Sequence, residues 1–194
     1  VVSLDHKNTH TKPFSESLRK EGSVQTSIRI GKQSILRSDP QYPDLLFLNH
    51  VLGGYFGSRL MKNIREEKGL TYGISSSLQA MKHGSYLMIG TDVTKENRDL
   101  AVEEIKNELR KLRTKLIPDD ELETASNHFI GSLQTELSTA FAHADKVKNL
   151  LVYNLDKNFY QNLIARIESV SAGDLLQTAG THLNEQSFFE VSVG

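Results

Sequence analysis

The sequence contains no cysteine, no strong net charge and no long apolar run, and each absence excludes a class of protein. With no cysteine among 194 residues, disulfides, thiolate zinc sites and a cysteine nucleophile are excluded. A formal net charge of -1 provides no general attraction to nucleic acid or to an anionic membrane, so neither is an expected partner. No apolar stretch approaches the about 18 residues of a membrane-spanning helix, and no signal peptide is recognisable. The compartment stays open, because a cysteine-free chain suits the cytoplasm and the periplasm equally well.

Length and composition indicate one globular domain. A chain of 194 residues with 38% hydrophobic and 24% charged residues is typical of a single domain with a sizeable core. Residues 1–22 are polar and lack hydrophobic periodicity, so we interpret them as an N-terminal segment and a candidate linker, and residues 23–194 as the domain. Because the first residue is Val1 rather than methionine, we expect the chain to be a piece of a longer protein.

Hydrophobic alternation predicts strands at both ends of this domain and a hairpin near its middle. Residues 23–31 alternate apolar and polar side chains, which is typical of a half-buried strand. Residues 70–80 and 85–92 flank the short glycine-containing stretch MKHG, which predicts an antiparallel hairpin. A last strand is predicted at 187–193.

Apolar residues spaced three and four apart predict helices between and after these strands. Pro43 suits a helix start, Gly53 and Gly54 interrupt that helix, and Ser58 is predicted to cap a second helix that Gly69 ends in a left-handed conformation. Later helices are predicted from Thr94 to about Arg113, from Pro118, through 141–151, after a cap at Asp156, and after a capping box at Ser171–Asp174. The element order predicts an α+β fold, with an antiparallel or mixed sheet and helices packed on one face.

Seven histidines invite a search for a metal site. His6 and His10 are four residues apart, as two zinc ligands on one helix face would be, but HKNTH lacks the intervening glutamate and is not a convincing helix. The other histidines have no second histidine at helical spacing, and His50 and His128 are expected to be ordinary helix residues. We therefore expect no complete metal site in this chain.

The glycine-rich stretch GGYFGSR at 53–59 matches no catalytic motif. A serine hydrolase usually holds its nucleophile in a G-x-S-x-G turn, which is absent here. Glycines ahead of a helix can bind a phosphate through backbone amides, yet both the Walker spacing and the G-x-G-x-x-G pattern are missing. Packing or a bend is the favoured role of these glycines.

Arg65 and Tyr72 are the most informative candidates, because they flank a predicted helix end. Arg65 lies in the last helical turn and Tyr72 begins the next strand, so the two side chains can converge. Arginine offers forked donors to a carbonyl or carboxylate, and a tyrosine hydroxyl can donate to an oxygen that develops negative charge, as acyl chemistry requires. The alternative is that Arg65 neutralises a nearby carboxylate or the helix C-terminus while Tyr72 fills a strand face. Residue chemistry alone favours this structural alternative.

The run LGGYFGSRLMKNIREEKGLTYGISSS at 52–77 resembles the C-terminal, non-zinc half-domain of the pitrilysin/insulinase family of zinc metallopeptidases, which includes the mitochondrial processing peptidases. The order of the flanking segments extends the resemblance over about 23–194. It implies an α+β metallohydrolase half-domain of the LuxS/processing-peptidase type. In that family two similar halves enclose a peptide, one with zinc on an inverted H-x-x-E-H helix and the other supplying an arginine and a tyrosine.

The resemblance assigns Arg65 to anchoring the substrate backbone and Tyr72 to assisting the tetrahedral oxyanion in the complete enzyme. H-x-x-E-H occurs nowhere in the chain, so the chain alone is expected to be inactive and to carry no cofactor. The zinc is expected in a missing N-terminal half or in a separate H-x-x-E-H subunit, either of which would be the partner. A peptide is the implied substrate, and a dimer is a candidate assembly. The alternative is a non-catalytic scaffold or assembly subunit of the same fold.

Overall fold

A five-stranded sheet is the frame of the structure, a computed structural model that describes residues 12–194. The strands lie in the order β1-β5-β2-β4-β3. All neighbours pair antiparallel except β1 and β5, which are parallel, so the predicted mixed α+β sheet is confirmed. The strands are β1 (Ser15–Leu18), β2 (Gln25–Gln33), β3 (Thr71–Ala80), β4 (Ser85–Thr94) and β5 (Phe189–Val193).

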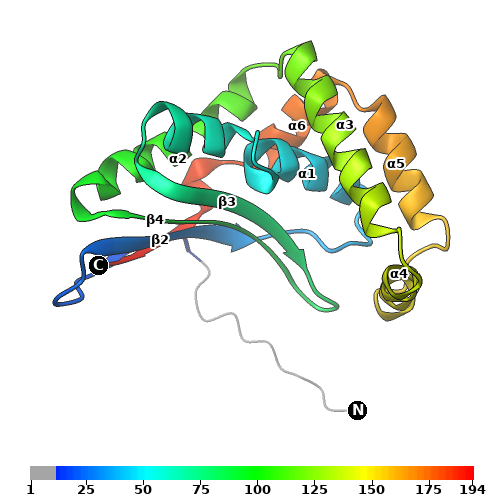
Figure 1. Cartoon of the computed structure of the whole chain (residues 1–194), viewed down its shortest axis with the longest axis horizontal. Coiled ribbons are helices and arrows are strands. Elements are labelled where there is room, and N and C mark those ends of the chain that lie inside the picture. Colours follow the sequence, from blue (N-terminus) through cyan, green and yellow to red (C-terminus); the bar gives the residue numbers. More distant parts are fainter. Residues whose placement is uncertain (1–11) are drawn as a thin grey trace, which may run out of the picture.

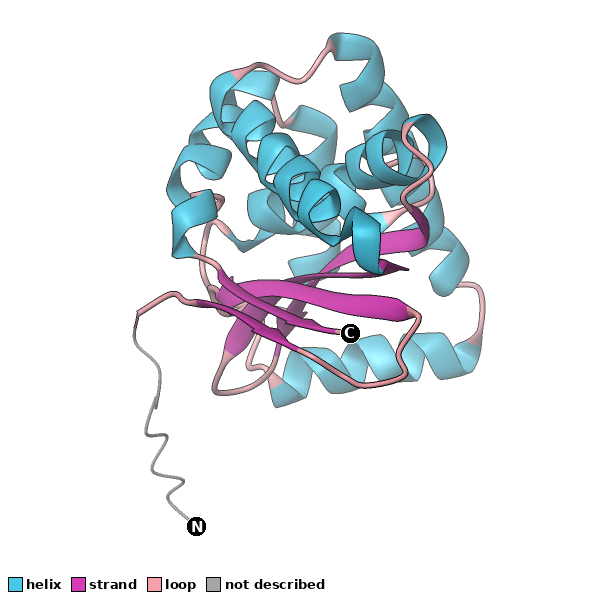
Figure 2. Cartoon of the chain, turned by 90° about the vertical axis from the view of Figure 1, so that its left-hand side faces the viewer, coloured by secondary structure: helices cyan, strands magenta, loops and turns pink. Residues whose placement is uncertain are grey.

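Helices cover one face of this sheet and leave the other face, called the open face below, without a helical layer (Figures 1 and 2). Helix α4 lies apart from the others at one end of the molecule, and none of its residues is buried. No helix in residues 12–194 is long and apolar enough to cross a membrane. The helical segments are α1 (Tyr42–Asn49), the π-helical η1 (His50–Gly54) and η2 (Met61–Glu67), the 3-10 turn η3 (Lys95–Asn97), α2 (Arg98–Thr114), α3 (Asp119–Glu136), α4 (Ala140–Val152), α5 (Phe159–Ser169), α6 (Ala172–His182) and the 3-10 turn η4 (Glu185–Ser187).

The apolar core lies between the sheet and the helices. Every second residue of the central strands points into it, among them Ile28 and Ile30 of β2 and Leu87 and Ile89 of β4, which are almost fully buried. Burying a side chain of this size contributes about 1.5–3 kcal/mol to stability. The intervening residues of the same strands face the open side, so the alternation that builds the core also builds an accessible surface.

Several local predictions are confirmed. The hairpin joins β3 and β4 at the predicted turn, and the first helix is interrupted at Gly53, whose backbone angles are not helical. A Cβ at Gly53 would lie 2.6 Å from the backbone nitrogen of Ser76, so only glycine lets this helix approach β3. Gly69 has a φ of 62°, the predicted left-handed conformation, and Ser171 and Asp174 form the predicted capping box.

Other predictions need correction. Strand β1 lies inside residues 1–22, so the sheet begins before residue 23; its sequence, SESL, has no hydrophobic period, and backbone pairing with β5 holds it in the sheet. Ser58 does not cap the second helix, because its hydroxyl is buried and has no hydrogen-bond partner in the described part of the chain. The helix predicted after Asp156 starts later, at Phe159.

Candidate functional site

Arg65 occupies the last turn of η2, at the outer edge of the sheet. The preceding residue, Ile64, is fully buried and anchors this turn in the core. Gly69 then reverses the chain: its amide bonds to the carbonyl oxygen of Arg65 at 3.2 Å, and the amide of Leu70 bonds to that of Ile64 at 2.9 Å. The left-handed residue directs the backbone straight into β3, which carries Tyr72. The helix end and the strand start are therefore held together by local hydrogen bonds.

Tyr72 lies in a β-bulge of the edge strand β3. Thr71 pairs with Val93 and Ile74 pairs with Thr91, so Tyr72 and Gly73 together oppose a single residue, Asp92. A regular strand would point Tyr72 to the same side as Ile74, which is buried beneath the helices. The extra residue in the bulge turns Tyr72 out of the core, and its side chain is 95% exposed. The bulge is therefore the feature that makes this tyrosine accessible.

Two threonine hydroxyls hold the bulge in place. The hydroxyl of Thr71 accepts a hydrogen bond from the amide of Gly73 at 3.1 Å and lies 2.7 Å from the carbonyl oxygen of Asp92. The hydroxyl of Thr91 lies 2.8 Å from that of Thr71 and 2.9 Å from the carbonyl oxygen of Gly73. These contacts satisfy backbone groups that the interrupted β ladder leaves unpaired.

The guanidinium of Arg65 lies close to two aromatic rings. Its Cζ atom is 4.7 Å from the centroid of the Phe56 ring and 5.9 Å from that of Tyr72. Its Nε atom donates a hydrogen bond of 2.9 Å to the carbonyl oxygen of Tyr72. Within residues 12–194 Arg65 forms no ion pair with a carboxylate, and the hydroxyl of Tyr72 has no hydrogen-bond partner. The structure thus brings the two candidate residues together, and Tyr72 does not fill a strand face.

Phe56 is a member of this site that sequence reasoning missed. Its side chain is 62% exposed although it is a large apolar residue. It lies in the glycine-rich stretch between η1 and η2, and its ring packs on Arg65. The sequence signal for Phe56 was an aromatic residue between glycines, shortly before a helix whose last turn carries an arginine. Sequence spacing alone does not reveal which face of that arginine the ring covers.

Among residues 12–194 no group of three or more histidine, cysteine, aspartate or glutamate side chains is arranged to hold a metal ion. His6 and His10 lie outside the described residues. His50 and His128 are helix residues, as predicted, but they also contact each other, since Nε2 of His50 lies 3.2 Å from Nδ1 of His128. The imidazole of His50 also stacks on the ring of Tyr55, with centroids 4.5 Å apart. This contact joins residues 78 positions apart, which no local pattern predicts.

Burial shifts the pKa of His50. Desolvation, and secondarily the nearby His128, lower the pKa of His50 from 6.5 to about 4, because a charged imidazole would lie among apolar and aromatic groups without water. Phe47 and Phe129 provide two of these groups, with ring centroids 6.4 and 5.2 Å from that of His50. His50 is therefore neutral near pH 7 and acts as part of the core.

Comparison with known proteins identifies the family. Residues 5–129, well over half of the chain, match the sequence profile described as Peptidase M16 inactive domain. This chain belongs to that family. The resemblance to the non-zinc half of a zinc peptidase is thereby confirmed at the level of the family.

Relatives of the M16 inactive domain are found among both sequences and structures. The Non-peptidase homolog YmxG of Helicobacter pylori is 29% identical over 146 residues, which cover 73% of this chain and 33% of that protein. The Uncharacterized zinc protease YmxG of Bacillus subtilis is 29% identical over 139 residues, 72% of this chain and 33% of that protein. A crystal structure of a peptidase M16 inactive domain from Pseudomonas fluorescens superposes with a TM-score of 0.87 and 24% identity, over 94% of this chain and 44% of that one.

The chain spans about a third of the length of these two curated relatives. It is an inactive, peptidase-like M16 domain, which agrees with the absence of H-x-x-E-H from its sequence.

Proposed function

We propose that this M16 domain is the substrate-binding half of a zinc metallopeptidase, and that Arg65 and Tyr72 act on a peptide held at a zinc site of another domain or chain. The observation that carries the proposal is the geometry of the pair. The guanidinium of Arg65 contacts the rings of Phe56 and Tyr72. A bulge turns Tyr72 into solvent, and its hydroxyl has no hydrogen-bond partner in the described structure. A purely structural role would need neither the bulge nor the exposure.

The two side chains suit different steps of peptide hydrolysis. With Nε used for the carbonyl of Tyr72, the two Nη groups of Arg65 remain available to a peptide carbonyl or carboxylate. The hydroxyl of Tyr72 would donate to the carbonyl oxygen of the scissile bond, on which negative charge develops in the tetrahedral intermediate. Arg65 would contribute mainly to binding, and Tyr72 to stabilising the transition state.

The zinc would come from elsewhere. The chain has no H-x-x-E-H motif, and the described residues offer no metal-binding group of three or more side chains. A zinc-bearing half of the same polypeptide or a separate H-x-x-E-H subunit would supply the metal, whose bound water would be the nucleophile. This chain would contribute Arg65, which binds the peptide, and Tyr72, which stabilises the oxyanion.

The decisive experiment measures zinc content and cleavage of a quenched fluorogenic peptide library by the full-length protein, with the 194-residue chain beside it. Zinc and cleavage are expected in the full-length protein and neither in the chain alone. Tyr72→Phe should lower kcat about 100-fold with little change in KM, as expected for the loss of one oxyanion donor. Arg65→Ala should chiefly raise KM, by about tenfold or more.

Matched variants control for non-specific damage. Tyr160→Phe on α5 and Arg110→Ala on α2 remove the same groups on the helical side of the molecule, and both should retain activity. If kcat is unchanged in Tyr72→Phe, the oxyanion role is wrong.

A non-catalytic scaffold or assembly subunit is the second candidate function. The observation in its favour is that the Helicobacter pylori relative is called a non-peptidase homolog. A full-length protein without zinc and without cleavage, even after addition of an H-x-x-E-H subunit, would support this second function and overturn the first.

A further inference from the structure

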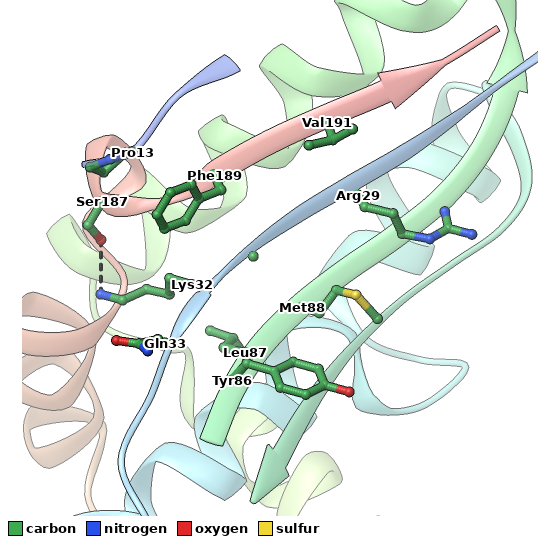
Figure 3. Close-up of a pocket in the computed structure, with 11 residues that line it drawn as sticks. Pro13, Arg29, Lys32, Gln33, Tyr86, Leu87, Met88, Ser187, Phe189 and Val191 are labelled. Atoms are coloured by element: carbon green, nitrogen blue, oxygen red, sulfur yellow. Dashed lines mark hydrogen bonds between the residues drawn. The ribbon is translucent and has the colours of Figure 1, made fainter. Parts of the chain in front are cut away.

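A groove of about 650 Å³ lies on the open face of the sheet, separate from the Arg65–Tyr72 pair (Figure 3). Residues of β2, β4 and β5 form most of its lining, and Pro13 and Ser187 close one end. None of the described residues that line it is acidic. The groove is thus a largely apolar surface with two basic residues in its lining, Arg29 and Lys32, of which Lys32 is hydrogen-bonded to the carbonyl oxygen of His182 and the hydroxyl of Ser187.

The strand register explains why the sheet is hollow at this point. Gly31 of β2 lies directly between Met88 of β4 and Phe189 of β5. Because Gly31 has no side chain, this row forms a slot with a thioether on one side and an aromatic ring on the other. A Cβ at Gly31 would lie 3.0 Å from the carbonyl oxygen of Leu87, so the floor of the slot is already in close contact.

The next row places a cation beside the slot. Arg29 lies between Val191 of β5 and Gly90 of β4, and its side chain extends across Gly90, where a Cβ would be only 3.4 Å away. Its Nη1 atom donates to the carbonyl oxygen of Thr91 at 3.2 Å. Asp92 is 3.7 Å from Arg29, but the arginine side chain is still 48% exposed, so it remains accessible to a second carboxylate.

The groove continues toward the candidate site. A smaller cavity of about 240 Å³ shares Arg29 and Met88 with the groove and is also lined by Gly73, the residue that follows Tyr72 in the bulge. An extended peptide that contacts Tyr72 can therefore follow the open face into the slot without leaving the surface.

The distance along this path sets the position of the subsite. On β4, Met88 lies four residues from Asp92, which opposes Tyr72, and this corresponds to about 14 Å along the strand. The slot is also two strands inward from β3, about 10 Å. An extended peptide advances about 3.3 Å per residue, so a side chain in the slot is roughly five residues from the one at Tyr72.

We propose that the groove is a peptide subsite that takes a large apolar side chain in the slot at Gly31 and an acidic side chain at Arg29. The inference rests on the proposed function, because it names the class of peptide that the Arg65–Tyr72 pair would act on. Charge complementarity favours this occupant, since Arg29 is still half-exposed beside Asp92 and lies two positions from the apolar slot on the same strand face. An extended peptide matches this spacing with an acidic residue two positions from a leucine or phenylalanine.

Direct binding to the 194-residue chain tests the groove without zinc or turnover. A fluorescent capped peptide that contains Asp-Ala-Leu, called the Asp-Leu peptide, is titrated and its anisotropy measured, beside an otherwise identical peptide with Asn-Ala-Leu, called the Asn-Leu peptide. The alanine places the two side chains on one face, as Arg29 and Gly31 are. The Asp-Leu peptide should bind more tightly, and Arg29→Gln should weaken it about fivefold while leaving the Asn-Leu peptide almost unchanged. Arg110→Gln, an arginine with the same exposed fraction on α2, should change neither.

A second pair of variants tests whether the peptide binds in the groove, beside Arg29. Val191→Glu places a carboxylate at the groove and should weaken binding of the Asp-Leu peptide about tenfold or more. Val193→Glu, on the same face of the same strand but outside the lining, should weaken it less than threefold. Thermal unfolding of each variant verifies that the fold is retained.

The outcomes separate this proposal from the proposed function. The groove proposal would be overturned if the two valine variants weakened binding equally, or if no binding were found at millimolar peptide. Binding that appears only after residues 1–11 are removed would also overturn it, because the chain's own N-terminus would then be the occupant. If the groove binds as expected while Tyr72→Phe leaves turnover unchanged, the subsite stands and the catalytic pairing fails. If turnover responds but the groove does not bind, only the subsite is wrong.

Discussion

The Nε atom of Arg65 donates a 2.9 Å hydrogen bond to the carbonyl oxygen of Tyr72, across the turn at which a helix ends and an edge strand begins. The bond uses the backbone of Tyr72, so the phenol of Tyr72 and the two Nη groups of Arg65 stay available. The ring of Phe56 also packs on the guanidinium, with its centroid 4.7 Å from Cζ. The site is thus organised by backbone conformation and ring stacking, and the groups suited to a substrate are left exposed.

The ring of Phe56 is predicted to hold Arg65 in place. Phe56→Leu removes a cation–π contact worth about 0.5–1 kcal/mol at an exposed site, so the Arg65 side chain should become more mobile. Nitrogen-15 relaxation of the Arg65 Nε signal measures this, and KM of the full-length enzyme should rise about threefold. Phe141→Leu, which alters another exposed ring, on α4, should leave both unchanged. A rigid Arg65 in Phe56→Leu would contradict the prediction.

The hydroxyl of Thr71 is predicted to maintain the bulge. Thr71→Val deletes its contacts with Gly73, Asp92 and Thr91, and the free energy of unfolding should fall by about 1–2 kcal/mol. Hydrogen exchange at the Gly73 amide should accelerate, because that amide loses its acceptor. Thr71→Ser keeps the hydroxyl and should restore slow exchange. If the Gly73 amide exchanges slowly in Thr71→Val and rapidly in Thr71→Ser, the methyl group rather than the hydroxyl holds the bulge.

Protonation of His50 is predicted to destabilise the fold at acid pH. The pKa of His50 is about 4 in the folded chain and near 6.5 when unfolded, so the unfolded state takes up the proton first. The contribution of neutral His50 to the free energy of unfolding is therefore largest above about pH 6.5 and decreases as the pH falls toward 4. Below pH 4 it decreases no further. The total decrease is on the order of 3 kcal/mol.

Urea unfolding at pH 7.0 and 4.5 measures this loss. His50→Gln should show a smaller difference between the two pH values than the unchanged chain. His143→Gln, at an exposed position of α4, should show the same difference as the unchanged chain. A pH dependence unaltered by His50→Gln would assign the acid sensitivity to other groups.

Part of the candidate site could be predicted from the sequence, because its signals are local. Gly69 ends a helix in the left-handed region, which an isolated glycine after an apolar periodic run already indicates. That placed Arg65 and Tyr72 on either side of one chain reversal. Phe56 was missed because its contact with Arg65 depends on how the glycine-rich stretch folds back, and glycines permit many conformations.

Strand β1 shows the corresponding limit for the fold. Its four residues, SESL, are all exposed, so they carry no hydrophobic alternation to detect. Parallel pairing with β5 determines its place, through bonds such as that from the Glu190 amide to the carbonyl oxygen of Phe14. Backbone hydrogen bonds are nearly independent of side-chain identity, and hydrophobic pattern therefore cannot reveal such a strand.

Local sequence signals were enough to predict the α+β class, the hairpin between β3 and β4, the helix end at Gly69, and that Arg65 and Tyr72 could meet there. Those features depend on alternation, turn residues and backbone preferences within about ten neighbouring residues. Tertiary structure was needed to show that a bulge turns Tyr72 outward and that Gly31 lies between Met88 and Phe189 to form a groove. The reason is that strand order and register are set by long-range pairing of the whole chain, and one shifted residue would move every side chain to the opposite face.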